Sequence, residues 1–502
     1  MASTEHSATG QTRPVKFILD GELIELHGVD PTRTVLQFLR EDLRRTGTKE
    51  GCAEGDCGAC TVALVELGQD GNSLKVLVVN SCIQFLPALD GKELITVESL
   101  VNEAGELHPV QQAIVDSHGS QCGFCTPGFV MSLFALYKNN PKPTRRHIDE
   151  ALSGNLCRCT GYQPIVEAAQ TMYQLPKAAD DWLRLAAGGL DDTTRIERLK
   201  NIQPDSMLQT GRDGRAFFTP LTLAELIDLK RRYPDATLLA GGTDVGLWVT
   251  KQQRQLDHLI YTGRVPELLR AGVTNDCIEI GAALPISEAA PLITRYYPDL
   301  DELFTRFASP PVRNVATLGG NIANGSPIGD SMPALMVLET RIVLQGLGGQ
   351  REMALEDFYL DYMATALEPD EVLVSIRIPL PDRASATRCY KVTKRFDQDI
   401  SALCMAMRVQ LDGDVVTAVR IAAGGLAAIP KRAPACEAAM KGQPWNTDTV
   451  RAGMQALAED FAPIDDMRAS AAYRFRCAQN LLRRFYLETT EGKNYSVYAY
   501  GR

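Results

Sequence analysis

The stretch GCAEGDCGACT, residues 51–61, places three cysteines and three glycines within eleven residues. Its cysteines are spaced as Cys52-x4-Cys57-x2-Cys60, and Cys82 follows after 21 intervening residues. This spacing is typical of plant-type [2Fe–2S] centres. Glycine lets a short loop bend around a compact inorganic core, and small side chains let backbone N–H groups approach the sulfur atoms. Structural zinc is the alternative, although zinc usually takes paired cysteine knuckles rather than three cysteines from one loop.

A second set of four cysteines lies further along the chain. Cys122-x2-Cys125 is followed, after 31 intervening residues, by Cys157-x-Cys159. Each pair precedes a predicted helix, and the threonine after each pair is expected to be its N-cap. Two helix N-termini would then direct their positive ends at one anionic cluster. Taken alone, two such pairs could instead bind zinc.

Composition limits the class of protein. The chain has 502 residues and a net charge of −10, which fits a globular protein of several domains. No basic stripe with interleaved aromatic residues indicates nucleic acid as a partner. No run approaches the ~18 apolar residues of a membrane span, and the polar N-terminus lacks a signal-peptide core. We therefore expect a cytoplasmic protein without a membrane partner, in which clustered thiols indicate metal rather than disulfides.

Hydrophobic patterning divides the chain into five parts. Residues 14–98 alternate as short strands around one helical stretch, and residues 99–176 have the pattern of helices. Residues 177–211 are polar and are interpreted as a surface linker. Residues 212–385 mix helices and strands, and residues 386–490 begin with strands and end with a helix.

Two glycine pairs lie in the fourth part. They occur in TLLAGGTDVGLWV (237–249) and ATLGGNIANGSPIGD (316–330). Neither is a G-x-G-x-x-G fingerprint, so a Rossmann nucleotide site is not supported. Glycine-rich turns can expose successive N–H groups to a pyrophosphate, but most glycine pairs only mark turns.

Three motifs, GCAEGDCGACT, QCGFCTPG (121–128) and GNLCRCTGY (154–162), resemble in this order the iron–sulfur portion of the xanthine dehydrogenase/aldehyde oxidase family of molybdenum hydroxylases. The resemblance covers roughly residues 14–490. It implies an α+β multidomain protein with a β-grasp ferredoxin-like domain, a four-helix [2Fe–2S] domain, an FAD-binding domain of the CO dehydrogenase flavoprotein (PCMH) type and a C-terminal α+β flavoprotein domain. Gln121 matches a family residue beside the pterin of the molybdenum cofactor.

The resemblance also implies the ligands. All eight cysteine positions match, so two [2Fe–2S] clusters are expected on Cys52, Cys57, Cys60 and Cys82, and on Cys122, Cys125, Cys157 and Cys159. The two glycine loops correspond to FAD-binding loops. The implied FAD contacts are Leu239, Ala240, Gly241, Gly242, Thr243, Asp244, Val245, Phe307, Thr317, Gly319, Gly320, Asn321, Asp330, Leu373 and Lys391.

Three residues are candidates for positions near the flavin ring: Phe307, Tyr362 and Asp397. Asp397 belongs to KRFDQD (394–399), which corresponds to a mobile family loop whose charges bear on the use of NAD or dioxygen. The simpler interpretation of this segment is a solvated charged turn. Tyr362 is placed on the nicotinamide side.

The family's large molybdenum-binding portion does not fit within the 502 residues. The chain therefore resembles the small subunit of enzymes of the xanthine dehydrogenase type, and a large molybdopterin-binding partner subunit is expected, as a dimer of heterodimers. The partner would hydroxylate hypoxanthine and xanthine to urate, and this chain would hold no catalytic residue for that step. Electrons would pass through the second cluster, the first cluster and FAD to NAD.

Three other functions stay open. The chain could serve another molybdenum hydroxylase that acts on an aldehyde, an N-heterocycle, carbon monoxide or an acyl-CoA. It could also be an electron carrier or diaphorase without a molybdenum partner. A zinc-bound interaction scaffold is the third alternative, and it predicts a colourless protein.

Overall fold

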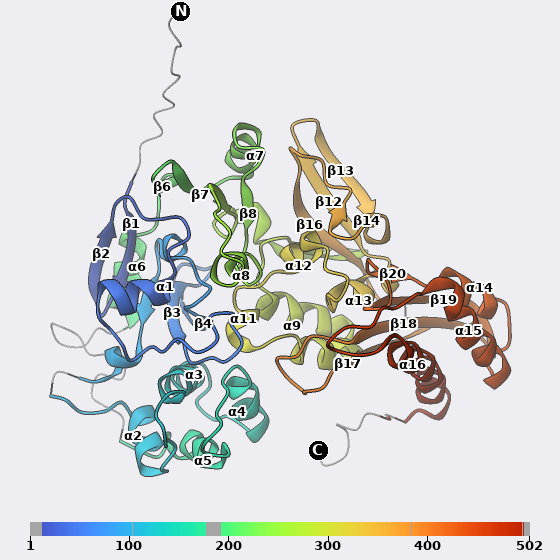
Figure 1. Cartoon of the computed structure of the whole chain (residues 1–502), viewed down its shortest axis with the longest axis horizontal. Helices are drawn as coiled ribbons and strands as arrows, with labels where there is room; N and C mark the ends of the chain where they lie inside the picture. The colour runs from blue at the N-terminus through green and yellow to red at the C-terminus, as the bar shows by residue number, and fades with distance from the viewer. Residues whose placement is uncertain (1–12, 103, 177–191, 383, 494, 496–502) are drawn as a thin grey trace, which may run out of the picture. The chain divides into compact units, whose positions relative to one another are not determined.

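The chain folds into two compact units, seen in a computed structural model that describes residues 13–102, 104–176, 192–382, 384–493 and 495 (Figure 1). The first unit comprises Met1–Pro266 and Ser309–Ala316, and the second Glu267–Ala308 and Thr317–Arg502. Among the described residues, no helix has the length and apolar character needed to cross a bilayer.

A five-stranded sheet of order β2-β1-β5-β3-β4 begins the first unit. Its pairs are antiparallel except for β1 with β5. Side chains of one face pack with Phe38 and Leu39, and those of the other face pack against the helices that follow. Because both faces are covered, β3 is an almost continuous apolar run. The elements are β1 (Val15–Leu19), β2 (Glu22–Leu26), α1 (Val35–Gln37) with a π-helical turn (Phe38–Asp42), β3 (Thr61–Leu67), β4 (Leu74–Asn80) and β5 (Glu93–Ile95).

Four helices follow the sheet, as the sequence predicts. They are α2 (Pro109–Asp116), α3 (Thr126–Asn139), α4 (Arg145–Leu152) and α5 (Gln163–Thr171). Residues 128–137 of α3 are all buried, because α3 lies between the sheet and the other helices. The predicted threonine caps are wrong. Cys125 occupies the N-cap of α3 and Tyr162 that of α5, so Thr126 lies inside its helix and Thr160 lies before the cap.

The rest of the first unit holds a four-stranded sheet of order β6-β7-β9-β8. Helix α6 precedes it, within the segment interpreted as a linker, of which residues 177–191 lie outside the described residues. Arg195 of α6 is only 1% exposed and donates to both carboxylate oxygens of Glu93, at 3.0 Å each. The elements are α6 (Asp192–Asn201), β6 (Leu208–Arg212), β7 (Arg215–Thr219), α7 (Leu223–Arg232), β8 (Thr237–Leu239), α8 (Val245–Thr250), β9 (His258–Tyr261) and α11 (Pro310–Arg313).

The second unit contains an antiparallel five-stranded sheet of order β10-β11-β16-β12-β13. Helix α12 contacts β16, and the β14–β15 hairpin is separate from the sheet. The strands are β10 (Ala271–Val273), β11 (Cys277–Gly281), β12 (Arg341–Gly346), β13 (Gly349–Ala354), β14 (Tyr359–Asp361), β15 (Ala364–Thr365) and β16 (Val372–Pro379). The helices are α9 (Ile286–Tyr296), α10 (Asp301–Thr305), α12 (Leu318–Asn324) and α13 (Ser331–Val337).

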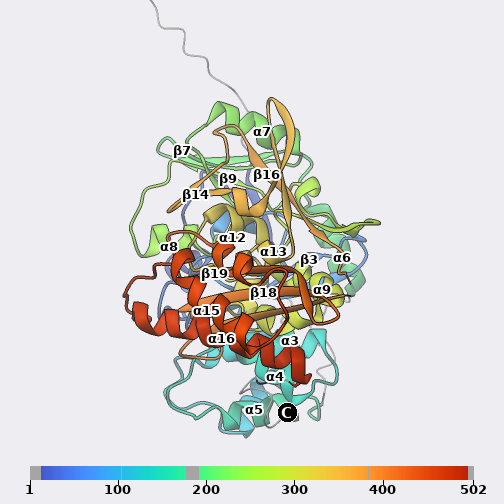
Figure 2. The same cartoon turned by 90° about the vertical axis from the view of Figure 1, so that its right-hand side faces the viewer.

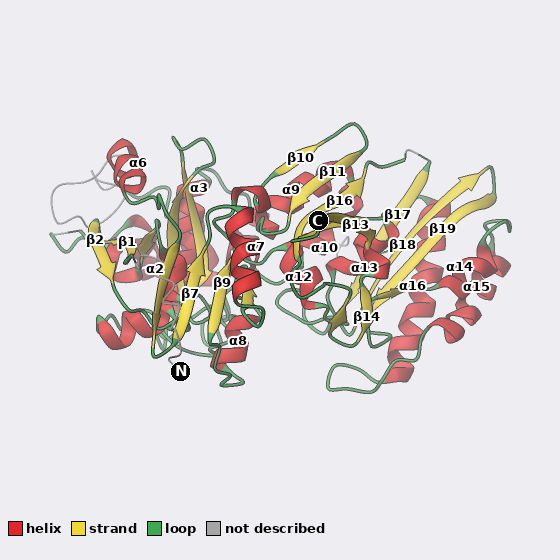
Figure 3. Ribbon diagram, turned by 90° about the horizontal axis from the view of Figure 1, so that it is seen from above, coloured by secondary structure: helices red, strands yellow, loops and turns green. Residues whose placement is uncertain are grey.

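A four-stranded antiparallel sheet of order β17-β18-β19-β20 completes the second unit. It is formed by β17 (Ser385–Val392), β18 (Leu403–Asp412), β19 (Val415–Gly424) and β20 (Lys431–Arg432), with helices α14 (Pro434–Met440), α15 (Thr447–Asp460) and α16 (Ala471–Glu491). Figure 2 shows α15 and α16 in front of β18 and β19, α14 contacts β19, and Figure 3 shows α13 on the opposite face. Alternate residues of β18, such as Met405 and Met407, share a core with Leu482 and Phe485 of α16.

Candidate cofactor-binding sites

The first four cysteines lie together, three in the loop before β3 and one in the turn after β4. The sulfur atoms of Cys60 and Cys82 are 3.3 Å apart, and the Cys52 thiol contacts those of Cys57 and Cys82. Cys60 and Cys82 are buried, whereas the other two are half-buried. The backbone N–H groups of Cys57 and Glu54 lie 3.3 and 3.5 Å from the Cys52 sulfur. Such N–H···S contacts stabilise negative charge on sulfur.

The second four cysteines also lie together, around the start of α3 and the loop before α5. The sulfur atoms of Cys122 and Cys159 are 3.6 Å apart, and the Cys125 thiol contacts that of Cys157. The N–H group and hydroxyl of Thr160 lie 3.5 and 3.2 Å from the Cys157 sulfur. Cys122 and Cys159 are exposed, so this group lies at the surface of the unit.

The thiols of each group influence one another electrostatically. A hydrogen bond with Cys57 lowers the pKa of Cys52, while the reciprocal bond raises the pKa of Cys57. Contact with Cys52 raises the pKa of Cys82, and burial raises the pKa of Cys125 to about 12. Neighbouring thiols therefore cannot all ionise unless a cationic centre compensates their charge. This donor set fits a metal core.

The geometry indicates which kind of core fits. Within the described parts of the chain, no three His, Cys, Asp or Glu side chains converge as ligands of one ion. The sulfur atoms of Cys60 and Cys82 are 3.3 Å apart and those of Cys122 and Cys159 are 3.6 Å apart, while Cys52 contacts both Cys57 and Cys82. Two thiolates on one tetrahedral metal lie roughly 3.8 Å apart, given metal–sulfur bonds of about 2.3 Å. Four thiols in each group that do not converge on one ion therefore fit a two-iron core better than a single zinc ion.

The first predicted FAD loop, Leu239–Val245, connects β8 to α8 in the first unit. A Cβ atom on Gly241 would lie 1.9 Å from the carbonyl oxygen of Val315, so only glycine fits there. Gly242 has a φ of +72°, which glycine adopts without strain. The N–H of Gly246 donates to the Gly242 carbonyl at 2.7 Å and closes the turn.

Helix α8 brings this loop against the first cysteine group. Leu247 packs against the buried cluster of Leu36, Cys60, Cys82 and Ile83. The Thr250 hydroxyl donates to the carbonyl of Ala53, which follows the first cysteine, at 2.7 Å. The glycine loop and the first cysteine loop are therefore neighbours within one unit. Ala240, Thr243 and Asp244 lie in the same turn, and burial raises the pKa of Asp244.

The second predicted FAD loop belongs to the second unit. Thr317 caps α12, and its hydroxyl accepts the N–H of Gly320 at 2.8 Å. A Cβ atom on Gly319 would lie 2.4 Å from the Ala282 carbonyl, so this glycine permits close packing. The side-chain oxygen of Asn321 accepts a hydrogen bond from the Ser331 hydroxyl at 2.6 Å, which ties the middle of α12 to the start of α13.

Asp330 is the centre of a buried polar cluster. Lys391 Nζ lies 2.6 Å from one carboxylate oxygen, and the Ser401 hydroxyl donates to the other at 2.5 Å. The side chains of Lys391 and Asp330 are only 3% and 9% exposed. A buried ion pair of this kind is stable only when its other polar atoms are also hydrogen-bonded. Here the Ser401 hydroxyl supplies that hydrogen bond to the second oxygen of Asp330.

The remaining candidates are less closely associated. Leu373 is buried on β16 opposite Leu344 of β12. Phe307 is half-buried just after α10, and Asp397 is half-buried in the loop after β17. Tyr362 lies at the tip of the β14–β15 hairpin and is 64% exposed.

Several residues of these sites have no signal in the sequence. Ser401 completes the Asp330 cluster, and the buried guanidinium of Arg306 donates to the carbonyls of Lys391 and Phe396. Asn155 lies inside the GNLCRCTGY motif but is neither a cysteine nor a glycine, so the chemistry of thiol ligands does not single it out. For Ser401 and Arg306, only spatial contact identifies them.

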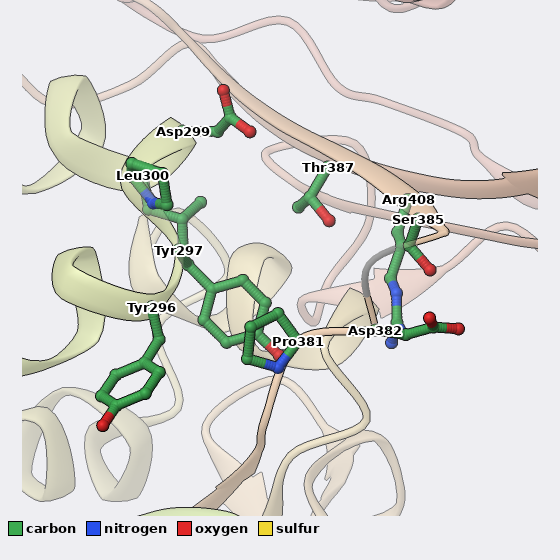
Figure 4. A pocket seen from close by; sticks show the side chains of 10 residues that line it. Tyr296, Tyr297, Asp299, Leu300, Pro381, Asp382, Ser385, Thr387 and Arg408 are labelled. Carbon is green, nitrogen blue, oxygen red and sulfur yellow. The ribbon is translucent and has the colours of Figure 1, made fainter.

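One small pocket of the second unit, of about 90 Å3, contains none of the predicted cofactor residues. Figure 4 shows Tyr296, Tyr297, Asp382, Thr387 and Arg408 among its lining side chains. The Tyr297 hydroxyl donates to a backbone carbonyl at 2.6 Å, and burial raises its pKa to about 12.

Comparison with protein families accounts for most of the chain. Residues 17–83 match the 2Fe-2S iron-sulfur cluster binding domain, and residues 96–170 match the [2Fe-2S] binding domain. Residues 210–381 match the FAD binding domain in molybdopterin dehydrogenase, and residues 388–489 match the CO dehydrogenase flavoprotein C-terminal domain. These matches confirm the predicted fold class, with two iron–sulfur domains and one FAD-binding domain.

The chain belongs to the molybdenum hydroxylase family. A carbon monoxide dehydrogenase structure from Hydrogenophaga pseudoflava is 30% identical, with a TM-score of 0.51, over 53% of this chain and 94% of that one. The xanthine dehydrogenases of Emericella nidulans and Drosophila pseudoobscura pseudoobscura are each 33% identical, over 94% and 96% of this chain. The chain spans only 38% and 40% of the length of those two relatives.

Proposed function

We propose that this chain is the iron–sulfur and FAD subunit of a xanthine dehydrogenase, which passes electrons from a molybdopterin-binding partner to NAD. The similarity to xanthine dehydrogenases over 94–96% of the chain supports this assignment. The carbon monoxide dehydrogenase structure, in contrast, corresponds to 53% of the chain. The order of iron–sulfur and FAD domains on one polypeptide is therefore shared with the xanthine dehydrogenases.

The eight cysteines are the proposed ligands of two [2Fe–2S] clusters, four for each. When bound, the clusters supply one-electron chemistry and FAD couples it to hydride transfer. The protein supplies N–H groups to the sulfur atoms of Cys52 and Cys157, which tune charge on these ligands. The Asp330–Lys391 pair is proposed to hold the second FAD loop in place, because it fixes the segment between α12 and α13 to β17.

The position of each cysteine group supports its place in the sequence of redox centres. The first group is adjacent to the β8–α8 loop, because Leu247 of α8 packs against the buried cluster that contains Cys60 and Cys82. The second group lies at the surface, where Phe124, Leu156 and Tyr162 are each more than a third exposed. We therefore place the flavin beside the first group and the molybdenum-bearing partner beside the second.

The acceptor is proposed to be NAD, with the loop after β17 near the flavin ring. Lys394 and Arg395 of this loop are exposed cations, which suit an anionic dinucleotide. Phe307, Asp397 and Tyr362 stay candidates for contacts with the flavin or the nicotinamide. A dimer of heterodimers remains the proposed assembly.

The decisive experiment is to purify the chain with whatever binds it and to assay xanthine-dependent NAD reduction. For each copy of this chain we expect four irons, because two [2Fe–2S] clusters hold four, and one FAD. We also expect one molybdopterin for each copy, bound by the partner. The masses of the polypeptides decide whether molybdenum is bound by a separate subunit. A complex that contains molybdenum but ignores both xanthine and hypoxanthine would disprove the substrate assignment and leave the electron-transfer role intact.

A second candidate is the equivalent component of another molybdenum hydroxylase. The 30% identity to the Hydrogenophaga pseudoflava carbon monoxide dehydrogenase structure favours it specifically in the FAD portion. The same preparation separates the two candidates, because reduction of the bound flavin by carbon monoxide, an aldehyde or an N-heterocycle, in place of a purine, would support the second.

A further inference from the structure

The two cysteine groups meet at one direct backbone contact. The N–H of Leu156 donates to the carbonyl oxygen of Cys57 at 3.0 Å. Leu156 immediately precedes Cys157, so this hydrogen bond joins the main chain of a proposed ligand in the first group to the neighbour of a proposed ligand in the second. The contact lies wholly within the first unit.

Two glycines make this approach possible. Gly58 has a φ of +70°, and a Cβ atom on it would lie 2.0 Å from the Gly154 carbonyl. A Cβ atom on Gly128, in the first turn of α3, would lie 2.1 Å from the Gly58 carbonyl. Any larger residue at these positions would separate the loops, since real Cβ contacts are never so short.

Asn155 secures the junction from inside. Its side chain is buried, with the residue only 2% exposed. The amide nitrogen donates to the Gly58 carbonyl at 3.0 Å and lies 3.3 Å from the Thr61 hydroxyl, while the Ser132 hydroxyl donates to the amide oxygen at 2.6 Å. One side chain therefore connects the first cysteine loop, the start of β3, α3 and the second cysteine loop.

We propose that Asn155 is a positioning residue that holds the Leu156–Cys57 hydrogen bond and so sets the coupling between the two clusters. This inference rests on the proposed function, since it assumes that both cysteine groups hold clusters. The amide of Asn155 donates to a carbonyl through its nitrogen and accepts a hydroxyl through its oxygen, so one side chain makes both contacts. An Asp at this position would place a negatively charged oxygen against the Gly58 carbonyl oxygen, which repels it. A Ser would be too short to reach both the Gly58 carbonyl and the Ser132 hydroxyl.

The test compares Asn155→Ala with Asn139→Ala in the purified chain with both clusters. Asn139 is the matched control, because its amide also joins α3 to the sheet, by donating to the Val76 carbonyl at 2.8 Å, but away from the cysteines. The first readout is amide hydrogen exchange at Leu156. Loss of a buried hydrogen-bond partner should accelerate this exchange roughly 10- to 100-fold in Asn155→Ala and leave it unchanged in Asn139→Ala.

The second readout is the electron paramagnetic resonance spectrum of the fully reduced protein. We expect both variants to retain the iron and sulfide content of the parent. The splitting that arises from interaction between the two reduced clusters should decrease only in Asn155→Ala. Unchanged exchange and unchanged splitting in that variant would overturn the inference, and so would equal changes in Asn139→Ala, because they would reflect general loosening.

A third variant keeps the proposal testable if Asn155→Ala does not assemble its clusters. Ser132→Ala retains the Asn155 amide but removes the hydroxyl that orients it. Exchange at Leu156 should therefore be faster and the splitting smaller than in the parent, by less than in Asn155→Ala. Parent-like spectra and exchange in Ser132→Ala would then overturn the inference. Absence of iron in the parent protein would instead disprove the proposed function, which distinguishes the two failures.

Discussion

Replacement of Arg306 should release the loop that follows β17. The residue is only 1% exposed, and its guanidinium donates to the carbonyls of Phe396 and Lys391 at 3.2 Å each and to the Thr393 hydroxyl at 2.9 Å. The guanidinium carbon also lies 4.9 Å from the centre of the Phe396 ring. A single buried side chain at the end of α10 thus fixes two positions of the loop, Thr393 and Phe396, to the end of β17.

The magnitude follows from these contacts. Arg306→Met would fill much of the same volume but leave the two carbonyls without this donor, at about 1–3 kcal/mol each. The lost cation–π contact adds about 1 kcal/mol. The ion pair with Glu302 adds little, because that carboxylate is 45% exposed. Allowing for partial relaxation, we expect the closed loop to be destabilised by about 3 kcal/mol, which raises the open population roughly 100-fold.

Limited digestion with trypsin measures that population. Lys394 and Arg395 are exposed cleavage residues within the loop, and cleavage follows the open population when opening is fast. The first cut in Arg306→Met should be up to ~100-fold faster than in the parent chain. Arg195→Met is the control, because it removes an equally buried arginine from the other unit. Parent-like cleavage in a folded Arg306→Met variant would refute the anchoring role.

Three further changes test the cofactor assignments. Cys57→Ser should remove about half of the iron and block purine-dependent NAD reduction, while NADH oxidation by a flavin-level dye persists; loss of both activities with FAD bound would contradict this. Gly58→Ala should lower the unfolding temperature and the iron content much more than Gly71→Ala, because both have a positive φ but only Gly58 has close neighbours; equal effects would implicate the dihedral alone. Lys391→Met should cost about 3–5 kcal/mol by leaving Asp330 buried without its cation, and should lower FAD content. Parent-like flavin retention and unfolding would count against that role.

The features predictable from sequence are those encoded by local spacing. Ligands that come from one short loop must be closely spaced, so the cysteines of residues 52–60 indicate a metal core without knowledge of the fold. The helices α2 to α5 likewise follow from apolar periodicity. Helix starts were less accurate, because a threonine after a cysteine can satisfy a thiol instead of capping. The Thr160 hydroxyl lies 3.2 Å from the Cys157 sulfur, and α5 begins only at Gln163.

The features not predictable from sequence are contacts between distant segments. Asp330 meets Ser401 across 71 residues, and Arg306 meets Phe396 across 90 residues. No local pattern encodes such pairs, since a buried arginine or serine has the same sequence signature as an exposed one. The family resemblance pointed to Asp330 and Lys391 separately, and the structure shows that they form one ion pair.

The reason for glycine at several positions of the three cysteine motifs becomes clear only from the three-dimensional structure. Gly58, Gly128 and Gly154 belong to separate stretches of sequence, and each could be interpreted as a turn or as a first-turn residue of a helix. In the structure they converge on the same junction, where Gly58 leaves room for the backbone of Gly154, Gly128 leaves room for the backbone of Gly58, and Gly154 leaves room for the side chain of Pro311. The two iron–sulfur parts are therefore packed tightly against each other at this junction. A substitution in one motif should displace the other, and separate expression of the ferredoxin-like part would expose the Gly58 carbonyl that Asn155 now covers.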